Sequence, residues 1–157
     1  MKELIETLEV VKRVDYMLDT CFLIYMIKKG KVKDLVKFCE SNSVGMSSFN
    51  LAEIEHVHHK LDGTFNHRLR DFFKKKLISV VDVSVSPGDR NGEKDYVQSF
   101  DSKILGLVPD PSDAVLFVQA LQTKANVLTR DRHHIFKAVA ENYSKEYGVE
   151  VLNELPK

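Results

Sequence analysis

The sequence has no excess of charge and few cysteines, and both shortages restrict what it can do. Its 157 residues include 23 Lys and Arg and 23 Asp and Glu, so the formal net charge is zero. A strongly basic coat for nucleic acid is therefore excluded, although a locally basic surface around an acidic pocket is not. The two cysteines, Cys21 and Cys39, lack C-x-x-C spacing and lie in apolar helical patterns, which favours buried thiols over a disulfide or a metal pair.

Long hydrophobic runs, internal repeats, low-complexity segments and Pro- or Gly-rich linkers are also missing from the sequence. No apolar run approaches the roughly 20 residues that a membrane span requires, and the N-terminus has acids where a signal peptide has positive charge. We therefore expect a cytoplasmic protein with no membrane association. A length close to the ~150 residues of one domain predicts a single domain over residues 1–157.

Strand-like and helix-like segments alternate along the chain. Short apolar or β-branched segments predict strands at residues 13–18, 43–47, 77–85, 126–129 and 149–152. The spacing of apolar residues predicts helices at residues 1–12, 20–28, 32–41, 50–61, 65–76 and 133–146, and one more that begins at Pro111. The polar segment 86–109 is either a helix or a mobile insertion. The alternation predicts an α/β fold in which helices cover both faces of a parallel sheet.

Four acidic residues fall where an open parallel sheet places its ligand site, outside the carboxyl ends of its strands. Asp19 and Asp131 directly follow two predicted strands, while Glu53 and Asp113 are expected in the first turns of two helices. Converging carboxylates repel one another, and a hard divalent cation bound through oxygen relieves that repulsion. Enzymes that hydrolyse phosphodiesters commonly use carboxylates that bind Mg²⁺ or Mn²⁺.

Each of these acids also has an ordinary structural explanation. An acid near a helix N-terminus is favoured by the helix dipole. Asn50 and Glu53 have the spacing of a capping box, and Asp110 is placed to cap the helix that begins at Pro111. It is the joint placement of the four acids that indicates a site.

Four short segments occur in this order along the chain: Leu18-Asp19-Thr20, the segment from Ser47 to Glu53, Pro111-Ser112-Asp113-Ala114, and the segment from Val127 to Asp131. Together they resemble the motifs of the PIN-domain nucleases. The resemblance implies a three-layer α/β/α sandwich with a mostly parallel, five-stranded sheet. It also implies a Mg²⁺- or Mn²⁺-dependent endoribonuclease, a family that includes VapC-type toxins and RNA-processing factors.

The resemblance assigns a role to each motif residue. Asp19, Glu53, Asp113 and Asp131 would be the catalytic and metal-binding acids, and the hydroxyls of Thr20 and Thr129 would support them. The partners implied are RNA, a cognate antitoxin or an RNA-processing partner, and a second copy of the chain in a homodimer. Many members carry another acid after the fourth motif, where this chain has Arg132-His133-His134.

Basic residues are the candidates for holding RNA phosphates around the acids. The candidates are Lys28, Lys29, Arg68, Arg70, Arg130, Arg132 and His133. Solvated helix faces explain the lysine and arginine clusters equally well. For the whole protein, the alternative to a nuclease is a PIN-like module that binds RNA or a protein without cutting.

Overall fold

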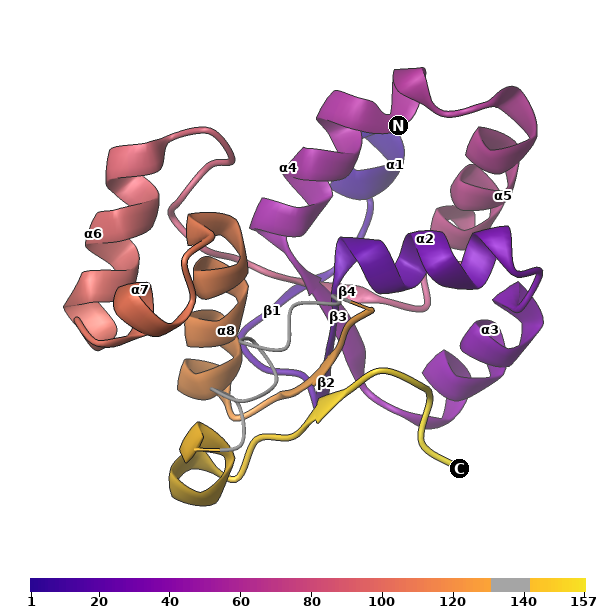
Figure 1. Ribbon diagram of the computed structural model, residues 1–157. Helices are drawn as coiled ribbons and strands as arrows, with labels where there is room; N and C mark the ends of the chain where they lie inside the picture. Colours follow the sequence, from indigo (N-terminus) through magenta and orange to yellow (C-terminus); the bar gives the residue numbers. More distant parts are fainter. Residues whose placement is uncertain (131–141) are drawn as a thin grey trace.

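Six short strands form one parallel sheet in the computed structural model, which describes residues 1–130 and 142–157 (Figure 1). Their order across the sheet is β1-β4-β3-β2-β5-β6, and every neighbouring pair is parallel. Their bounds are β1 Val10–Val11, β2 Tyr16–Leu18, β3 Val44–Ser47, β4 Ser79–Val81, β5 Asn126–Leu128 and β6 Val151–Leu152. Because all the strands are parallel, their carboxyl ends lie at one edge of the sheet, as the predicted ligand site requires.

Helices connect these strands and cover both faces of the sheet (Figure 1). Their bounds are α1 Lys2–Glu6, α2 Thr20–Lys28, α3 Val32–Ser41, α4 Ser48–Val57 with a 3₁₀ turn at His58–Lys60, α5 Gly63–Lys74, α6 Arg90–Phe100, α7 Ile104–Leu107 and α8 Pro111–Thr123. Residues 142–147 are also helical. The carboxylates of Asp62 and Asp110 cap α5 and α8 by accepting hydrogen bonds from the first-turn backbone N–H groups.

Two hydrophobic cores lie on opposite faces of the sheet. Successive strand residues alternate between them, so Met17 and Val127 belong to one core while Leu18 and Leu128 belong to the other. The first core is covered by α6, α7 and α8, and the second by α1, α2, α3 and α5. Helix α4 contributes to both cores. The result is the three-layer α/β/α arrangement that the sequence resemblance implies.

The N-terminal segment differs from the helix predicted over residues 1–12. Helix α1 ends at Glu6, and the β-branched pair Val10–Val11 forms the edge strand β1 beside β4. This two-residue strand is the sixth of the sheet, one more than the resemblance implies. Helical spacing in a short segment did not distinguish a helix from a helix followed by a strand.

Strand β4 is shorter than the strand predicted over residues 77–85. Beyond Val81, the hydroxyl of Ser48 bonds both backbone groups of Val83, donating to its carbonyl at 3.2 Å and accepting from its N–H at 2.9 Å. The side-chain amide of Gln119 donates to the carbonyl of Val81 at 2.9 Å. Side chains therefore satisfy backbone groups that a longer strand would pair with its neighbour.

The polar segment 86–109 contains the helices α6 and α7, which agrees with the helical alternative of the prediction. Most of the helix predicted at residues 133–146 lies outside the described residues, although 142–147 are helical.

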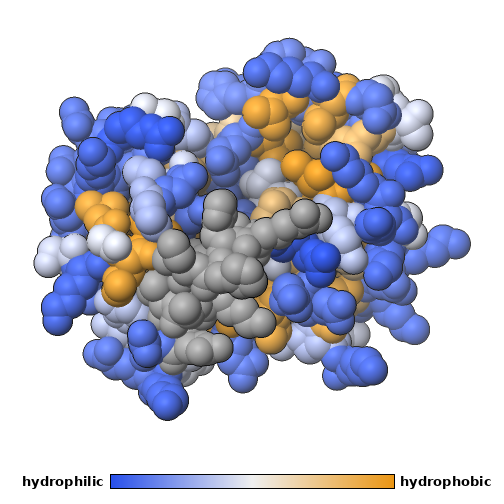
Figure 2. Space-filling model, viewed as in Figure 1, coloured by the Kyte–Doolittle hydropathy of each residue, from blue (hydrophilic) through white to orange (hydrophobic). Residues whose placement is uncertain are grey.

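The face of the molecule seen in Figure 2 is largely hydrophilic, with hydrophobic residues gathered between α4 and α5. None of the described helices is both long and apolar enough to cross a bilayer.

Replacement of Gly45 tests how tightly the centre of the sheet is packed. A Cβ atom at this position of β3 would lie 2.9 Å from a methyl carbon of Val14 and 3.0 Å from the carbonyl oxygen of Ser79. We expect Gly45→Ala to lower the free energy of unfolding by about 1–3 kcal/mol, measured by urea denaturation. Gly63→Ala is the control, because its added Cβ would meet no atom within 4 Å beyond its chain neighbours and the backbone of its own helix. An equal loss in both variants would contradict the packing argument.

Candidate active site

An acidic cavity of about 340 Å³ opens at the carboxyl edge of the sheet. It lies where the N-terminal ends of α2 and α8 meet α4, and no basic side chain is among the described residues that line it. The lining residues are Asp19, Thr20, Cys21, Ile24, Asn50, Glu53, Asp110, Ser112, Asp113 and Leu116. Three of the four predicted acids therefore share one cavity, although they are far apart in the sequence. The fourth, Asp131, lies outside the described residues.

The carboxylate of Asp19 is fixed by one neighbour from the end of β5 and one from α2. Asp19 leaves β2 as the N-cap of α2, and its backbone N–H bonds the carbonyl of Leu128 in β5 at 2.9 Å. The hydroxyl of Thr129 donates to Oδ2 of Asp19 at 2.7 Å, and the thiol of Cys21 donates to the same oxygen at 3.1 Å. Thr129 therefore contacts the predicted acid directly.

Cys21 lines this cavity, whereas its apolar helical pattern predicts a thiol buried in the core. Its sulfur also accepts a hydrogen bond from the backbone N–H of Arg130 at 3.3 Å. Burial, followed by the charge of Asp19, raises the pKa of Cys21 to about 12, so the thiol stays protonated and can donate. Its position two residues after Asp19, at the start of a helix, is the sequence feature that could have placed Cys21 in the site. Cys39 is buried as predicted, and both cysteines are free thiols.

Glu53 lies in the second turn of α4 and not in the first, because α4 begins earlier than predicted. The N-cap is Ser47, whose hydroxyl accepts a hydrogen bond from the backbone N–H of Phe49 at 3.2 Å. Asn50 is therefore not the cap. Its side-chain amide nitrogen donates to Oε1 of Glu53 at 2.9 Å, and its backbone carbonyl accepts a long contact of 3.5 Å from the hydroxyl of Thr20. Thr20 thus lines the cavity through contact with α4.

Burial is the main cause that raises the pKa of Glu53 above its ordinary value. The hydrogen bond from Asn50 opposes this shift, while the charges of Asp19, Asp110 and Glu93 add to it. The acids of the cavity therefore act on one another across the space between them.

The oxygen-rich lining fits a hard divalent cation. Carboxylates from three elements face one cavity, and Oδ1 of the buried Asn50 has no hydrogen-bond partner among the described residues. Within that part of the chain, no three His, Cys, Asp or Glu side chains converge into a ready-made metal cage. A loose arrangement is compatible with Mg²⁺, which keeps several waters and is bound through one or two carboxylates plus substrate phosphates. The protein groups that would hold the cation are Asp19, Glu53 and Asp113.

A family model described as PIN domain matches residues 16–142. The chain belongs to the PIN domain family. PIN domains are generally nucleases, so the acidic cavity lies in a fold associated with nucleic-acid hydrolysis. No curated protein matches this PIN domain significantly in sequence.

A solved structure shares the fold of this PIN domain. It is the crystal structure of VapBC2 from Rickettsia felis bound to a DNA fragment from their promoter. The superposition has a TM-score of 0.58 and covers 89% of this chain and 98% of the other, at 17% sequence identity. The likeness agrees with the α/β/α architecture described above.

Among the described residues, the predicted basic side chains do not line the acidic cavity. Lys28 and Lys29 are exposed at the C-terminal end of α2, roughly 13 Å along the helix from Asp19. Arg68 and Arg70 are exposed on α5, and neither lines the cavity. Arg132 and His133 lie outside the described residues.

The side chain of Arg130 is engaged within the protein. Its guanidinium lies 4.0 Å from the ring centroid of Tyr25, and Nη1 donates to the carbonyl of Asn153 at 3.0 Å. Arg130 thus links the end of β5 to α2 and to the C-terminal segment. A contact with RNA would have to compete with these two interactions.

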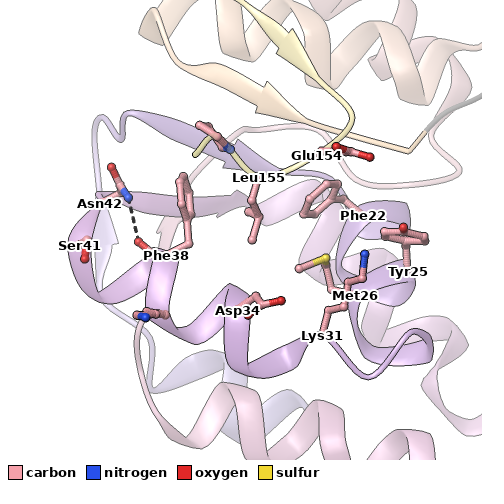
Figure 3. A pocket seen from close by; sticks show the side chains of 12 residues that line it. Phe22, Tyr25, Met26, Lys31, Asp34, Phe38, Ser41, Asn42, Glu154 and Leu155 are labelled. Carbon is pink, nitrogen blue, oxygen red and sulfur yellow. Dashed lines mark hydrogen bonds between the residues drawn. The ribbon is translucent and has the colours of Figure 1, made fainter.

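A second cavity, of about 460 Å³, lies between α2, α3 and the C-terminal segment. Leu155 points into it from that segment, opposite Phe22 and Met26 of α2 (Figure 3). The rim carries charges of both signs, from Lys31, Lys37, Asp34 and Glu154. It shares no residue with the acidic cavity, so the two are distinct.

The raised pKa of Glu53 predicts a pH-dependent effect of Glu53→Gln without metal. Because the folded pKa exceeds the unfolded value of about 4.3, ionised Glu53 lowers stability at neutral pH. This loss of stability shrinks as the pH falls through the pKa that Glu53 has in the folded protein. It vanishes below the pKa that Glu53 has in the unfolded chain. We expect Glu53→Gln to raise Tm in EDTA by up to about 2–4 °C at pH 7, with no gain near pH 4. A lower Tm at pH 7, or a gain independent of pH, would contradict the argument.

Proposed function

We propose that this PIN domain is a Mg²⁺- or Mn²⁺-dependent endoribonuclease. Its catalytic and metal-binding acids would be Asp19, Glu53, Asp113 and Asp131. The observation that supports the proposal is the meeting of Asp19, Glu53 and Asp113 in one cavity without a basic side chain among its described lining residues. A structural role as helix-start acids does not require α2, α4 and α8 to present their carboxylates to the same space.

The residues of the cavity have separable tasks in this proposal. When bound, the cation would make hydroxide available and shield the charge that builds on the phosphate. Thr129 and Cys21 hold Oδ2 of Asp19 in one orientation, and Asn50 does the same for Oε1 of Glu53. Such hydrogen bonds to ligating carboxylates preserve the geometry of a metal site.

The proposed reaction is an in-line attack of water on the RNA phosphodiester. The water oxygen forms a bond to phosphorus while the bond from phosphorus to the 3′ oxygen breaks. A proton from water ends on the departing 3′ oxygen, so the products carry a 3′-hydroxyl and a 5′-phosphate. Asp131 would complete the cluster or orient the attacking water.

The biological setting we propose is a toxin-type or RNA-processing nuclease. The structural neighbour is a VapBC2 complex bound to promoter DNA, which supports a cognate antitoxin as a partner of this chain. An RNA-processing partner is the alternative, and homodimer formation is compatible with either.

Asp113→Asn gives the decisive test of the nuclease proposal. Loss of this carboxylate should leave RNA binding close to that of the parent, because the chemical step and not the encounter depends on it. Since removing groups that merely support metal ligands costs 10–100-fold, we expect cleavage to slow by about 100-fold or more. Cleavage is measured with end-labelled single-stranded and hairpin RNAs, in Mn²⁺ and in EDTA.

Asp62→Asn is the matched control for this experiment. It makes the same chemical change at the start of α5, outside the acidic cavity, and should cut RNA at the parental rate. Equal cleavage by Asp113→Asn and the parent would remove Asp113 from the mechanism. RNA binding by both proteins, with no cleavage by either in Mn²⁺, would instead favour the non-catalytic binding module.

A further inference from the structure

We infer that Asp110 is a further carboxylate of the acidic cavity and binds the divalent cation, directly or through water, together with Asp19, Glu53 and Asp113. The inference rests on the proposed metal-dependent function. It adds a residue that the sequence resemblance does not assign, because the sequence pattern predicts only a helix-capping role for Asp110. Four observations within the described residues support it.

The first observation is the position of Asp110. It lines the same cavity as Asp19, Glu53 and Asp113, and it is exposed toward solvent at the start of α8. It precedes Asp113 by three residues, a spacing that places both side chains on one side of a helix N-terminus.

The second observation is how the two carboxylate oxygens of Asp110 are used. Oδ1 accepts the capping hydrogen bond from the backbone N–H of Ser112 at 2.8 Å. No hydrogen bond to Oδ2 occurs among the described residues. The cap therefore fixes the orientation of the carboxylate while one oxygen keeps its capacity to bind a cation or a cation-bound water.

The third observation is an unpartnered oxygen on the other side of Glu53. Asn50 is only 4% exposed and lines the cavity, yet its Oδ1 makes no hydrogen bond with the described residues. Its amide nitrogen is engaged with Glu53, which fixes the orientation of the group. A buried acceptor without a donor is unfavourable, and a water molecule bound to a cation in the cavity would supply that donor.

The fourth observation is the charge balance. Four carboxylates line the cavity, and none of the described lining residues is basic. Capping α8 needs no negative charge, since Asn and Ser are as good at the N-cap position as Asp. A fourth carboxylate adds repulsion to the metal-free cavity, and a bound cation removes that repulsion.

Asp110→Asn separates the two roles of this residue, because Asn preserves the cap and removes the charge. We expect the Kd for Mn²⁺, measured by the electron paramagnetic resonance signal of free Mn²⁺, to rise by about five- to tenfold. Without metal, Tm should equal or exceed that of the parent, and the rise in Tm on adding Mn²⁺ should be smaller. Asp62→Asn, the same change at the cap of α5, should leave both quantities unchanged.

Asp110→Ser provides a second uncharged cap and guards against a folding defect peculiar to Asn. Mn²⁺ binding by either folded variant with the parental Kd would overturn the inference and leave the nuclease proposal intact. If the parent itself binds no Mn²⁺ and cuts no RNA, the proposed function and the inference fail together. Weaker Mn²⁺ binding in both variants, with the parental Kd in Asp62→Asn, would establish the role of the charge.

Discussion

The pairing of β2 with strands on both sides is the constraint on which the acidic cavity depends. β2 has only three residues, yet it bonds to β3 on one side and β5 on the other. Asp19 follows it directly, and both its backbone and its carboxylate are tied to the end of β5 through Leu128 and Thr129. A slip of this register by one residue would turn Asp19 away from the cavity, because side chains alternate along a strand.

Around this fixed acid, the sheet brings together groups that electrostatics alone would separate. Each carboxylate that joins the cavity raises the cost of ionising the next. The charges of Asp19 and Asp110 add in this way to the raised pKa of Glu53, although burial is its larger cause. Hydrophobic burial on both faces of the sheet supplies the stabilisation that holds them there. Function at such a site and stability of the metal-free protein therefore make opposing demands on the same side chains.

Local patterns in the sequence predicted the elements whose ends are set by local chemistry. Helices α2 and α3 have the predicted bounds, and α8 begins at Pro111 after the Asp110 cap, as expected. The start of α4 was misplaced because Asn50 has the spacing of a cap, whereas Ser47 actually performs it. The edge strand β1 was missed because its partner in β4 lies some seventy residues away, and no local pattern reports such a contact.

The same distinction applies to the cavity. The motifs predicted that Asp19, Glu53 and Asp113 would come together, and these three acids do line one space. The contributions of Cys21 and Asn50 were not predicted, because their contacts with the acids form only when separate elements pack together. Arg130 shows the converse, since its place beside Asp131 in the fourth motif suggested RNA binding, while the structure engages its side chain with Tyr25 and Asn153.

The division of the protein into two cores has a consequence for its genetics. Asp19, the N-cap of α2, is supported by one core, and Asp110 and Asp113 at the start of α8 are supported by the other. Helix α4 packs into both cores through Phe49 and Ile54. The spacing of the acids thus depends on how the two layers sit against the sheet. If the proposed activity holds, a selection for its loss would recover substitutions at buried core positions such as Phe49 and Ile54 together with changes in the acids themselves. The positions of these substitutions would mark the contacts between the helical layers and the sheet.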